Sequence, residues 1–339
     1  MKKDNCKPAT LTAALLLAAL SVAGCGREAA DAPVAAAGSS AASSTVAGWP
    51  RTLETARGPL TLAAPPQRIV STSVTLTGTL LTIEAPVIAS GATLGGSTVS
   101  DTQGFFSQWA DIARARQVRP LYQGEPDAEA VAAAAPDLIV MAGTGGDSAL
   151  RLYEPLSQVA PVLVVNYDDK SWQELARLLG RATGHEAQAE QAVAAFADDV
   201  ARTRAQLRLP PQPVTALVYY ADGSGANVWT ADSAQGRLLG DLGFSLAPIP
   251  DGVRGDYSLG RRKDIVQLSG ETFAQGLTGR SLLLFSAAEA DAAALRANPF
   301  LAANEAVRSG EVHTLGLDTF RLDYYSSRRL LAHLRERFR

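Results

Sequence analysis

The stretch HEAQAEQAVAAFADDVARTRAQLRL, residues 185–209, predicts one long helix in the middle of the chain. It contains no glycine or proline and consists mostly of strong helix formers. About 22 helical residues, each rising 1.5 Å, give a helix roughly 33 Å long. The segment PPQP, residues 210–213, ends it, because proline lacks the amide hydrogen that a continuing helix needs. Residues 185–209 therefore divide the chain into two parts.

The part before this helix has the pattern of an α/β domain. Short apolar runs alternate with helical segments, which is typical of a parallel sheet covered by helices. The expected strands are 67–74, 85–92, 136–143 and 160–167. Helices are expected at 127–135 and 171–184, the second with an N-terminal serine cap and a C-terminal glycine.

The part after the helix repeats the pattern. Its expected strands are 214–220, 280–287 and 311–317, and its expected helices are 234–243, 269–277 and 323–338. About 290 residues are many for one core and natural for two. We therefore predict an α/β fold of two Rossmann-like lobes with central sheets, residues 49–184 and 210–339, joined by the single long helix 185–209.

The N-terminus has the pattern of an export signal. Three lysines precede the apolar run 11–20, which is too short to cross about 30 Å of hydrocarbon. The sequence Val-Ala-Gly-Cys at 22–25 resembles a bacterial lipobox, which predicts a signal peptide over residues 1–24 and lipid attachment at Cys25. A cleavable signal with a chance cysteine is the alternative. Residues 25–48, rich in alanine, serine and glycine, are expected to be a flexible tether.

Composition excludes several kinds of function. Of the two cysteines, Cys6 leaves with the signal and Cys25 is used for the lipid. No cysteine then remains for a disulfide, thiol catalysis or a metal site. Residues 1–24 carry three lysines and one aspartate, so their removal takes the formal net charge from −3 to −5. A nucleic-acid partner is not expected of so acidic a chain. An anionic ligand would need positive charge concentrated in one place.

Motifs for catalysis are mostly missing. His185, His313 and His333 lie far apart and not at ligand spacing, and there is no H-E-x-x-H, no G-x-S-x-G and no Walker phosphate loop. The segment GTGGDS, residues 143–148, follows an expected strand. It is either a simple connection or a loop that offers backbone N–H groups, and Ser148, to an anion.

The segment DTFRLDYYSS, residues 318–327, places an arginine, Arg321, among aromatic rings in a chain with only 6% aromatic residues. The neighbouring rings are Phe320, Tyr324 and Tyr325. One interpretation is core packing beside a salt bridge from Arg321 to Asp318 or Asp323. The other is a pocket for a flat, negatively charged ligand, because arginine offers five fixed donors and stacks on rings.

Three further features have two interpretations each. Trp229, after a turn rich in glycine and serine, is either a lid over the core or a platform for a ligand. The charged segment 253–264, which contains Arg262, is either a solvated loop or a source of positive charge for a site. Glu129 and Glu271 each lie in the first turn of an expected helix, one in each lobe. They either stabilise the helix N-terminus or contact a partner.

Several segments together resemble the ferric enterobactin-binding periplasmic proteins. The most specific are STSVTLTG (71–78), NYDDKSWQ (166–173) and TFRLDYYS (319–326), whereas QRIVS and PDLI mark only the wider family of siderophore, haem and cobalamin binders. The other segments are 65–78, 85–93, 124–139, 144–157, 209–220, 226–230 and 264–271. The resemblance extends from about residue 49 to the C-terminus.

The resemblance implies a substrate-binding protein of an ABC importer, with the class III fold of two lobes bridged by a helix. Its ligand would be iron(III) wrapped by three catecholates, a trianion with aromatic faces. The siderophore would hold the iron, so no protein metal site or cofactor is expected. The protein would be a monomeric binder in the cell envelope, lipid-anchored on the periplasmic side, and not an enzyme.

The resemblance also assigns residues. Arg321 and Trp229 fall at positions that match ligand contacts, and Tyr324 would help to shape the pocket. The loop 92–106 has no basic residue, so either charge comes from elsewhere, with Arg261, Arg262 and Lys263 as candidates, or the preferred ligand is less charged. Glu129 and Glu271 fall where the family carries one acidic residue per lobe to dock on arginines of the permease.

Three other functions stay open on sequence alone. The first is a binder of another iron chelate, haem or cobalamin with the same fold. The second is an envelope enzyme such as a siderophore esterase, although the chain offers no evident Ser–His pair. The third is a structural lipoprotein, for which two lobes and a stiff connection would be unusual.

Overall fold

The computed structural model describes residues 48–220, 222–253, 255 and 263–339. Residues Thr45–Arg339 form one compact unit. The expected signal peptide, the tether, Cys25 and Arg262 lie outside the described residues. Within the described part, no helix is both long enough and apolar enough to cross a bilayer.

The N-terminal lobe is built on a parallel sheet of five strands in the order β5-β4-β3-β6-β7. The strands are β3 (Ile69–Ser71), β4 (Val87–Ala92), β5 (Arg119–Gln123), β6 (Leu138–Ala142) and β7 (Val162–Val165). Every residue of β3, β6 and β7 is buried. This explains why the sequence shows continuous apolar runs rather than alternation.

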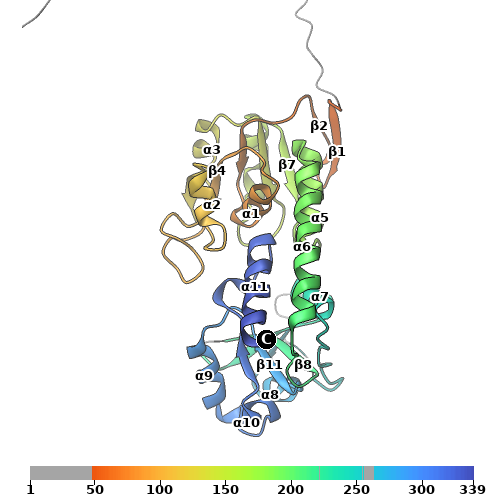
Figure 1. The fold of residues 1–339 in the computed structure, drawn as a ribbon. Helices are drawn as coiled ribbons and strands as arrows, with labels where there is room; N and C mark the ends of the chain where they lie inside the picture. Colours follow the sequence, from red (N-terminus) through yellow and green to blue (C-terminus); the bar gives the residue numbers. More distant parts are fainter. Residues whose placement is uncertain (1–47, 221, 254, 256–262) are drawn as a thin grey trace, which may run out of the picture. The chain divides into compact units, whose positions relative to one another are not determined.

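Short helices cover both faces of this sheet (Figure 1). They are α1 (Val74–Thr82), α2 (Ala110–Ala115), α3 (Ala128–Ala133), η1 (Leu150–Leu152), α4 (Tyr153–Ser157) and α5 (Trp172–Thr183). The Ser171 side chain caps α5 and Gly184 ends it in the left-handed conformation, as expected. The antiparallel hairpin β1 (Arg51–Thr55) and β2 (Gly58–Leu62) was not predicted, because its alternating, half-exposed residues form no apolar run.

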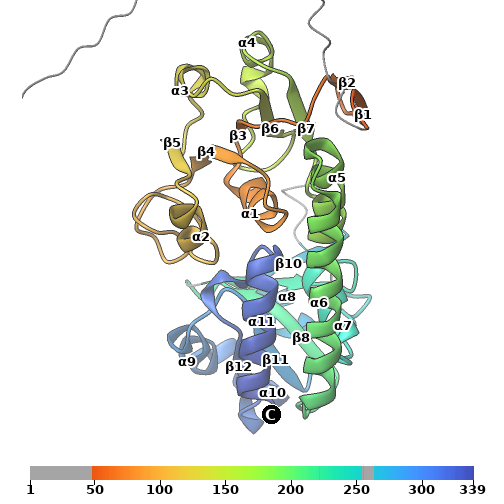
Figure 2. The ribbon, with the colours of Figure 1, turned by 45° about the horizontal axis from the view of Figure 1, so that its top comes forward.

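The predicted long helix is α6 (Glu186–Gln206). In both views it reaches from the N-terminal lobe into the C-terminal lobe, beside α11 (Tyr324–Arg337) (Figures 1 and 2). Its buried positions Ala189, Ala192 and Phe196 lie on one face, and Phe196 packs edge-on against Trp172, with ring centroids 5.2 Å apart. The helix is thus fixed by packing at both lobes.

The C-terminal lobe has a mixed sheet of five strands in the order β10-β9-β8-β11-β12. The strands are β8 (Val214–Tyr219), β9 (Gly225–Trp229), β10 (Ile265–Ser269), β11 (Ser281–Leu284) and β12 (Val312–Thr314). β8, β11 and β12 run parallel, whereas β9 is antiparallel to both β8 and β10. The helices are α7 (Ala234–Asp241), α8 (Glu271–Gly276), α9 (Glu289–Ala297), η2 (Pro299–Leu301), α10 (Glu305–Ser309), η3 (Leu317–Thr319) and α11.

The fold is therefore the predicted α/β arrangement of two lobes joined by one long helix. The sequence did not reveal β5, β9 and β10. All three are short, β5 contains a proline, and β9 begins with glycine and contains asparagine, which are unfavourable in strands. Gly225 is required there, because a Cβ would lie 2.1 Å from the carbonyl oxygen of Leu268 on the paired strand.

Candidate functional site

A cavity of about 610 Å³ lies between the two lobes, and we call it the cleft. The N-terminal lobe lines it with Thr75, Thr79, Phe106, Gln108, Tyr167, Asp168, Asp169, Lys170, Trp172 and Leu175. The C-terminal lobe lines it with Trp229, Asp232, Ala234, Gln235, Arg237, Lys263, Asp264, Ile265, Phe320, Arg321, Leu322 and Asp323. A second, more open hollow of about 900 Å³ has no phenylalanine, tyrosine or tryptophan in its lining, so it does not match the predicted aromatic pocket.

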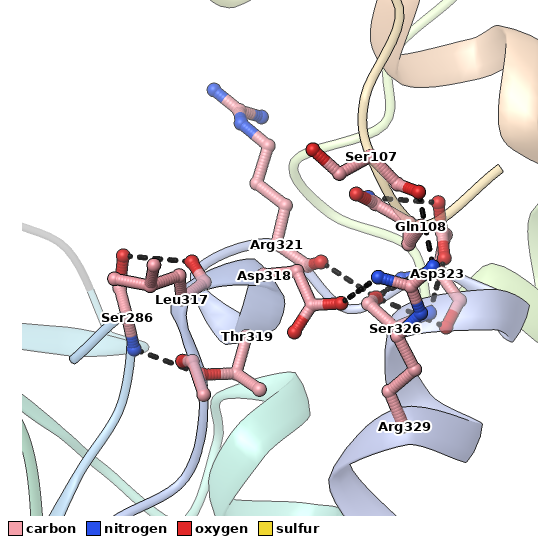
Figure 3. Close-up of polar contacts among 11 residues, drawn as sticks. Ser107, Gln108, Ser286, Leu317, Asp318, Thr319, Arg321, Asp323, Ser326 and Arg329 are labelled. Carbon is pink, nitrogen blue, oxygen red and sulfur yellow. Dashed lines mark hydrogen bonds and ion pairs between the residues drawn. The ribbon is translucent and has the colours of Figure 1, made fainter. Parts of the chain in front are cut away.

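Arg321 lies in the cleft and not in a salt bridge. Figure 3 shows its side chain extending away from the polar cluster formed by the neighbouring acids. Asp318 pairs instead with Arg329 (Oδ2 to Nη1, 2.7 Å), and Asp323 accepts from the backbone N–H of Ser326 (2.8 Å). Within the described part of the chain, the Arg321 guanidinium forms no ion pair. The pocket interpretation of residues 318–327 is thus favoured over the salt-bridge one.

Hydrogen bonds hold the backbone on both sides of Arg321. Asp323 and Ser326 form a reciprocal capping box at the start of α11, and the Ser326 hydroxyl also donates to the Arg321 carbonyl (2.9 Å). On the other side, Gln235 Nε2 donates to the Phe320 carbonyl (2.6 Å). The Thr319 hydroxyl accepts from the backbone N–H of Ser286 (2.8 Å; Figure 3). The position of Arg321 is therefore set by the C-terminal lobe.

The aromatic rings near Arg321 come from three different segments. Its Cζ lies 5.2 Å from the ring centroid of Tyr167, which belongs to the N-terminal lobe. Phe320 is 40% exposed and packs edge-on against Trp229, with centroids 5.7 Å apart. Tyr167 and Trp229 are each only 6% exposed. The rings closest to Arg321 thus belong to Tyr167, Trp229 and Phe320, and Phe106 and Trp172 also line the cleft.

Trp229 ends strand β9 rather than a loop, and its indole lines the cleft. Its Nε1 is buried and has no hydrogen-bond partner among the described residues. Buried polar groups are normally paired, so an unpaired donor at the edge of a cleft is notable. The N–H would have to become accessible before it could donate to an oxygen of a bound ligand.

Tyr324 lies elsewhere than the sequence suggested. It packs against Trp172 and Tyr325, with centroids 5.4 and 5.3 Å away, and Arg328 lies over its ring. Neither Tyr324 nor Tyr325 lines the cleft. The reason is that α11 begins at Tyr324, and the helix turns these side chains away from Arg321. The contact between Tyr324 and a ligand stays a prediction. The position of Tyr324 outside the cleft lining does not support it.

Positive charge in the cleft comes from both lobes. The described cations in its lining are Lys170, Arg237, Lys263 and Arg321, and the acids are Asp168, Asp169, Asp232, Asp264 and Asp323. Arg262 lies outside the described residues, but its neighbour Lys263 lines the cleft. The loop 92–106 contributes only Phe106. Lys170 and Arg237 thus supply charge that the sequence reasoning did not assign, although NYDDKSWQ was among its most specific segments.

Three buried or half-buried groups near the cleft have shifted pKa values. Burial raises the pKa of Asp323, which is 8% exposed, and hydrogen bonds from Ser326 and Gln108 offset this only in part. Burial also acts to raise the pKa of Asp147, but hydrogen bonds from Ser73, Thr75 and Tyr167 outweigh it and hold that pKa below the usual value. Burial raises the pKa of Tyr167 to about 12, so its hydroxyl stays protonated.

The two glutamates predicted to dock on a partner each lie at the start of a helix. Glu129 is exposed in the first turn of α3, whose N-cap Asp127 accepts from the Glu129 backbone N–H (2.9 Å). Glu271 is the first residue of α8. Asp127 also accepts from the Ala130 backbone N–H (3.2 Å), so the N-cap of α3 is Asp127 and not Glu129.

No group of three or more His, Cys, Asp or Glu residues that could hold a metal ion occurs among the described residues. His313 instead faces Glu311 (2.9 Å), and His185 contacts the Thr183 carbonyl (3.0 Å). The described lining of the cleft offers a ligand charge and aromatic contact.

Two α/β lobes, one bridging helix and a cleft between the lobes define a substrate-binding protein of class III. A sequence model described as "Periplasmic binding protein" matches residues 70–319. The chain belongs to this family, whose members are binding components of transport and not enzymes.

Individual relatives agree with this assignment. The chain is 55% identical over 292 residues to the ferric enterobactin-binding periplasmic protein FepB of Escherichia coli O6:H1 strain CFT073, a match that covers 86% of this chain and 92% of that one. The crystal structure of holo-ViuP is 36% identical, with a TM-score of 0.76 and coverage of 86% and 95%. The periplasmic catecholate-siderophore binding protein VctP of Vibrio cholerae, 18% identical with a TM-score of 0.57 and coverage of 84% and 99%, shares the fold.

Proposed function

We propose that this protein binds a ferric catecholate siderophore of the enterobactin kind in the cleft and delivers it to an inner-membrane ABC permease. The observation that carries the proposal is Arg321, which lies on an aromatic ring in the cleft without an ion pair to a described residue. The 55% identity to a protein named for ferric enterobactin binding supports the choice of ligand.

The chemistry of the cleft suits such a ligand. A ferric tris-catecholate is a trianion with flat aromatic faces, so it calls for cations and rings together. The guanidinium of Arg321, which forms no ion pair with a described residue, offers planar donors, and charge-assisted hydrogen bonds are the stronger kind. The indole N–H of Trp229, without a partner among the described residues, would add a neutral donor once binding makes it accessible. Iron remains inside the siderophore, and the protein recognises the outside of the complex.

A less highly charged iron chelate, haem or cobalamin is the second candidate ligand. The observation in its favour is the charge of the cleft lining, where, among the described residues, five acids accompany four cations. One of these cations, Lys170, is already paired with Asp169 (2.6 Å). Burial raises the pKa of Asp323 and so disfavours its negative charge, which counts in favour of an anionic ligand.

Two further parts of the proposal concern location and delivery. Lipid attachment at Cys25 would hold the monomer at the periplasmic side of a membrane, with residues 26–48 as a tether. Glu129 and Glu271, one in each lobe, would meet arginines of the permease. Both parts rest on the lipobox pattern and on the helix positions given above.

The test is tryptophan fluorescence of the chain without residues 1–24, with Cys25→Ala to prevent lipidation. Trp172 and Trp229 line the cleft and report on its occupation. Ferric enterobactin, a ferric hydroxamate, haemin and cobalamin are titrated in parallel. We expect saturable quenching by the catecholate alone. Quenching by another ligand only would overturn the choice of ligand, and quenching by none would overturn the function.

A further inference from the structure

The carboxylate of Asp147 lies at the hydroxyl end of the Tyr167 ring, and the Arg321 guanidinium lies over that ring. The Tyr167 hydroxyl donates to Asp147 Oδ1 (2.8 Å). The other oxygen of Asp147 accepts from the Ser73 hydroxyl (2.5 Å) and from the backbone N–H of Thr75 (3.0 Å), at the start of α1. The orientation of the Tyr167 ring is therefore fixed at its hydroxyl end by a group that is itself fixed.

The glycine-rich segment GTGGDS makes room for this hydroxyl. Gly145 has a φ of +85°, and a Cβ there would lie 1.6 Å from the Tyr167 oxygen. Gly146, the next residue, has open space around it. The Ser148 hydroxyl donates to the Ala142 carbonyl (2.8 Å), and no residue of 143–148 lines the cleft. The segment is thus built around Tyr167 rather than around an anion in the cleft.

The far side of the arrangement is Arg321 itself. Its guanidinium, carried by the C-terminal lobe, lies over a ring carried by the N-terminal lobe. A cation is attracted to the negative face of an aromatic ring. Donation of the phenol hydrogen to a carboxylate polarises the ring further, so Asp147 strengthens this attraction. Asp147, Tyr167 and Arg321 therefore form a continuous line from the N-terminal lobe into the cleft.

We propose that Asp147 and Tyr167 are positioning residues, which hold the Arg321 guanidinium across the cleft in the orientation that meets an aromatic anion. A long arginine side chain otherwise samples many rotamers and must be ordered when ligand binds. The ring removes that freedom in advance. The ligand part of this inference rests on the proposed function, whereas the restraint of Arg321 exists without any ligand.

The restraint is tested first in the ligand-free protein. The measurement is the ¹⁵N heteronuclear NOE of the Arg321 Nε–H group, which reports fast side-chain motion. We expect a lower NOE in Tyr167→Leu and in Gly145→Ala than in the wild type. Gly146→Ala is the matched control for the loop and should leave the NOE unchanged. An equal NOE in wild type and Tyr167→Leu would overturn the proposal.

The consequence for binding is tested by a double-mutant cycle with ferric enterobactin. Tyr167→Leu should weaken binding by roughly three- to tenfold, the range of a partly desolvated cation–π contact. In an Arg321→Ala background the same change should have less than about a twofold effect, because contacting residues couple. Tyr122→Phe, which removes a hydroxyl bond to the Thr72 carbonyl (2.8 Å) outside the cleft, is the control and should bind normally.

The outcomes separate the two claims. An equal loss in both backgrounds would make Tyr167 a direct ligand contact and overturn its positioning role. If the wild type does not bind ferric enterobactin, the proposed function fails, and the NOE comparison alone decides whether Tyr167 restrains Arg321. Melting curves of all variants exclude unfolding as the cause of a loss.

Discussion

Two carboxylates near the cleft, one in each lobe, each accept a hydrogen bond at the start of a helix. Their pKa values are nevertheless shifted in opposite directions. Asp147 accepts a backbone N–H in the first turn of α1, and Asp323 accepts one in the first turn of α11. Asp147 is half-buried and has two further short bonds, from Ser73 and Tyr167. Asp323 is nearly inaccessible, and its contact from Gln108 is longer, at 3.3 Å.

The difference shows that burial alone does not set the charge of a cleft. Burial disfavours the carboxylate at both positions, and the number and quality of donors decide the outcome. The N-terminal half is therefore ordered around a fixed anion. In the C-terminal half, a group with a raised pKa lies two residues along the chain from the proposed ligand arginine.

The largest expected effect concerns delivery, where both lobes are needed at once. Glu129→Arg with Glu271→Arg should abolish uptake of the ferric siderophore by cells, because like charges would face the permease arginines. The affinity of the protein for the siderophore should stay unchanged. Uptake is measured with radioactive iron. The control is Glu54→Arg with Glu190→Arg, two exposed acids outside α3 and α8 with the same change in charge. Normal uptake by the first double variant would refute the docking proposal.

The next effect compares a ligand cation from each lobe. Arg321→Ala should weaken ferric catecholate binding by about ten- to a hundredfold, since a charge-assisted contact contributes about 1.5–3 kcal/mol. Lys170→Ala should lower affinity less, because Lys170 is already paired with Asp169. Titration of both variants checks the order. Arg328→Ala, which alters an arginine over Tyr324 outside the cleft, is the control. A larger loss from Lys170→Ala would place the main contact in the other lobe.

The opposite pKa shifts predict opposite pH profiles of stability. Asp147 has a lowered pKa, so its contribution is present above the unfolded pKa of about 4 and is lost as the pH falls through the lowered value. Asp147→Asn should therefore cost most near neutral pH. Asp323 has a raised pKa, so its contribution is present below about pH 4 and is lost as the pH rises through the raised value. The stability of Asp323→Asn relative to the wild type should therefore increase as the pH rises above about 4.

Urea unfolding of the three proteins at a series of pH values measures these profiles. The informative quantity is the difference in unfolding free energy between each variant and the wild type. The two differences should move in opposite directions with pH. Parallel movement would mean that the two carboxylates do not differ in the way the structure indicates.

The smallest effect concerns the contact between the lobes at Gln108. Gln108→Ala removes the donor to Asp323 and should lower the free energy of unfolding by no more than about 1 kcal/mol. Because this bond favours the charged form, its loss should raise the pKa of Asp323 further. The pH at which the Asp323 contribution disappears should then move upward. An unchanged profile would show that the 3.3 Å contact has no energetic weight.

The parts of the fold that the sequence predicted are those with strong local signals. The helix formers of residues 185–209 and the buried runs of β6 and β7 identified the bridging helix and the first sheet. The strands β5, β9 and β10 and the hairpin β1–β2 were missed. They are stabilised by their partners in the sheets rather than by their own residues.

For the site, too, the local sequence was informative, whereas contacts between the lobes could not be predicted from it. The unusual setting of Arg321 was visible in its own segment, and of the three rings near it in sequence, Phe320 lines the cleft. Tyr324 and Tyr325 are close in sequence and turn away with α11, whereas Tyr167 comes from the other lobe. Such contacts depend on how two domains face each other, which local patterns do not encode. The role of Gly145 likewise became clear only when Tyr167 was found beside it.

The central claim is that Arg321 and Trp229 meet a ferric catecholate in the cleft, and the structure of the complex with ferric enterobactin tests it most directly. The predicted result has the guanidinium of Arg321 and the indole Nε1 of Trp229 within about 3.2 Å of catecholate oxygens. Iron would be coordinated by the siderophore alone. A siderophore bound outside the cleft, or inside it without contact to Arg321, would contradict the account.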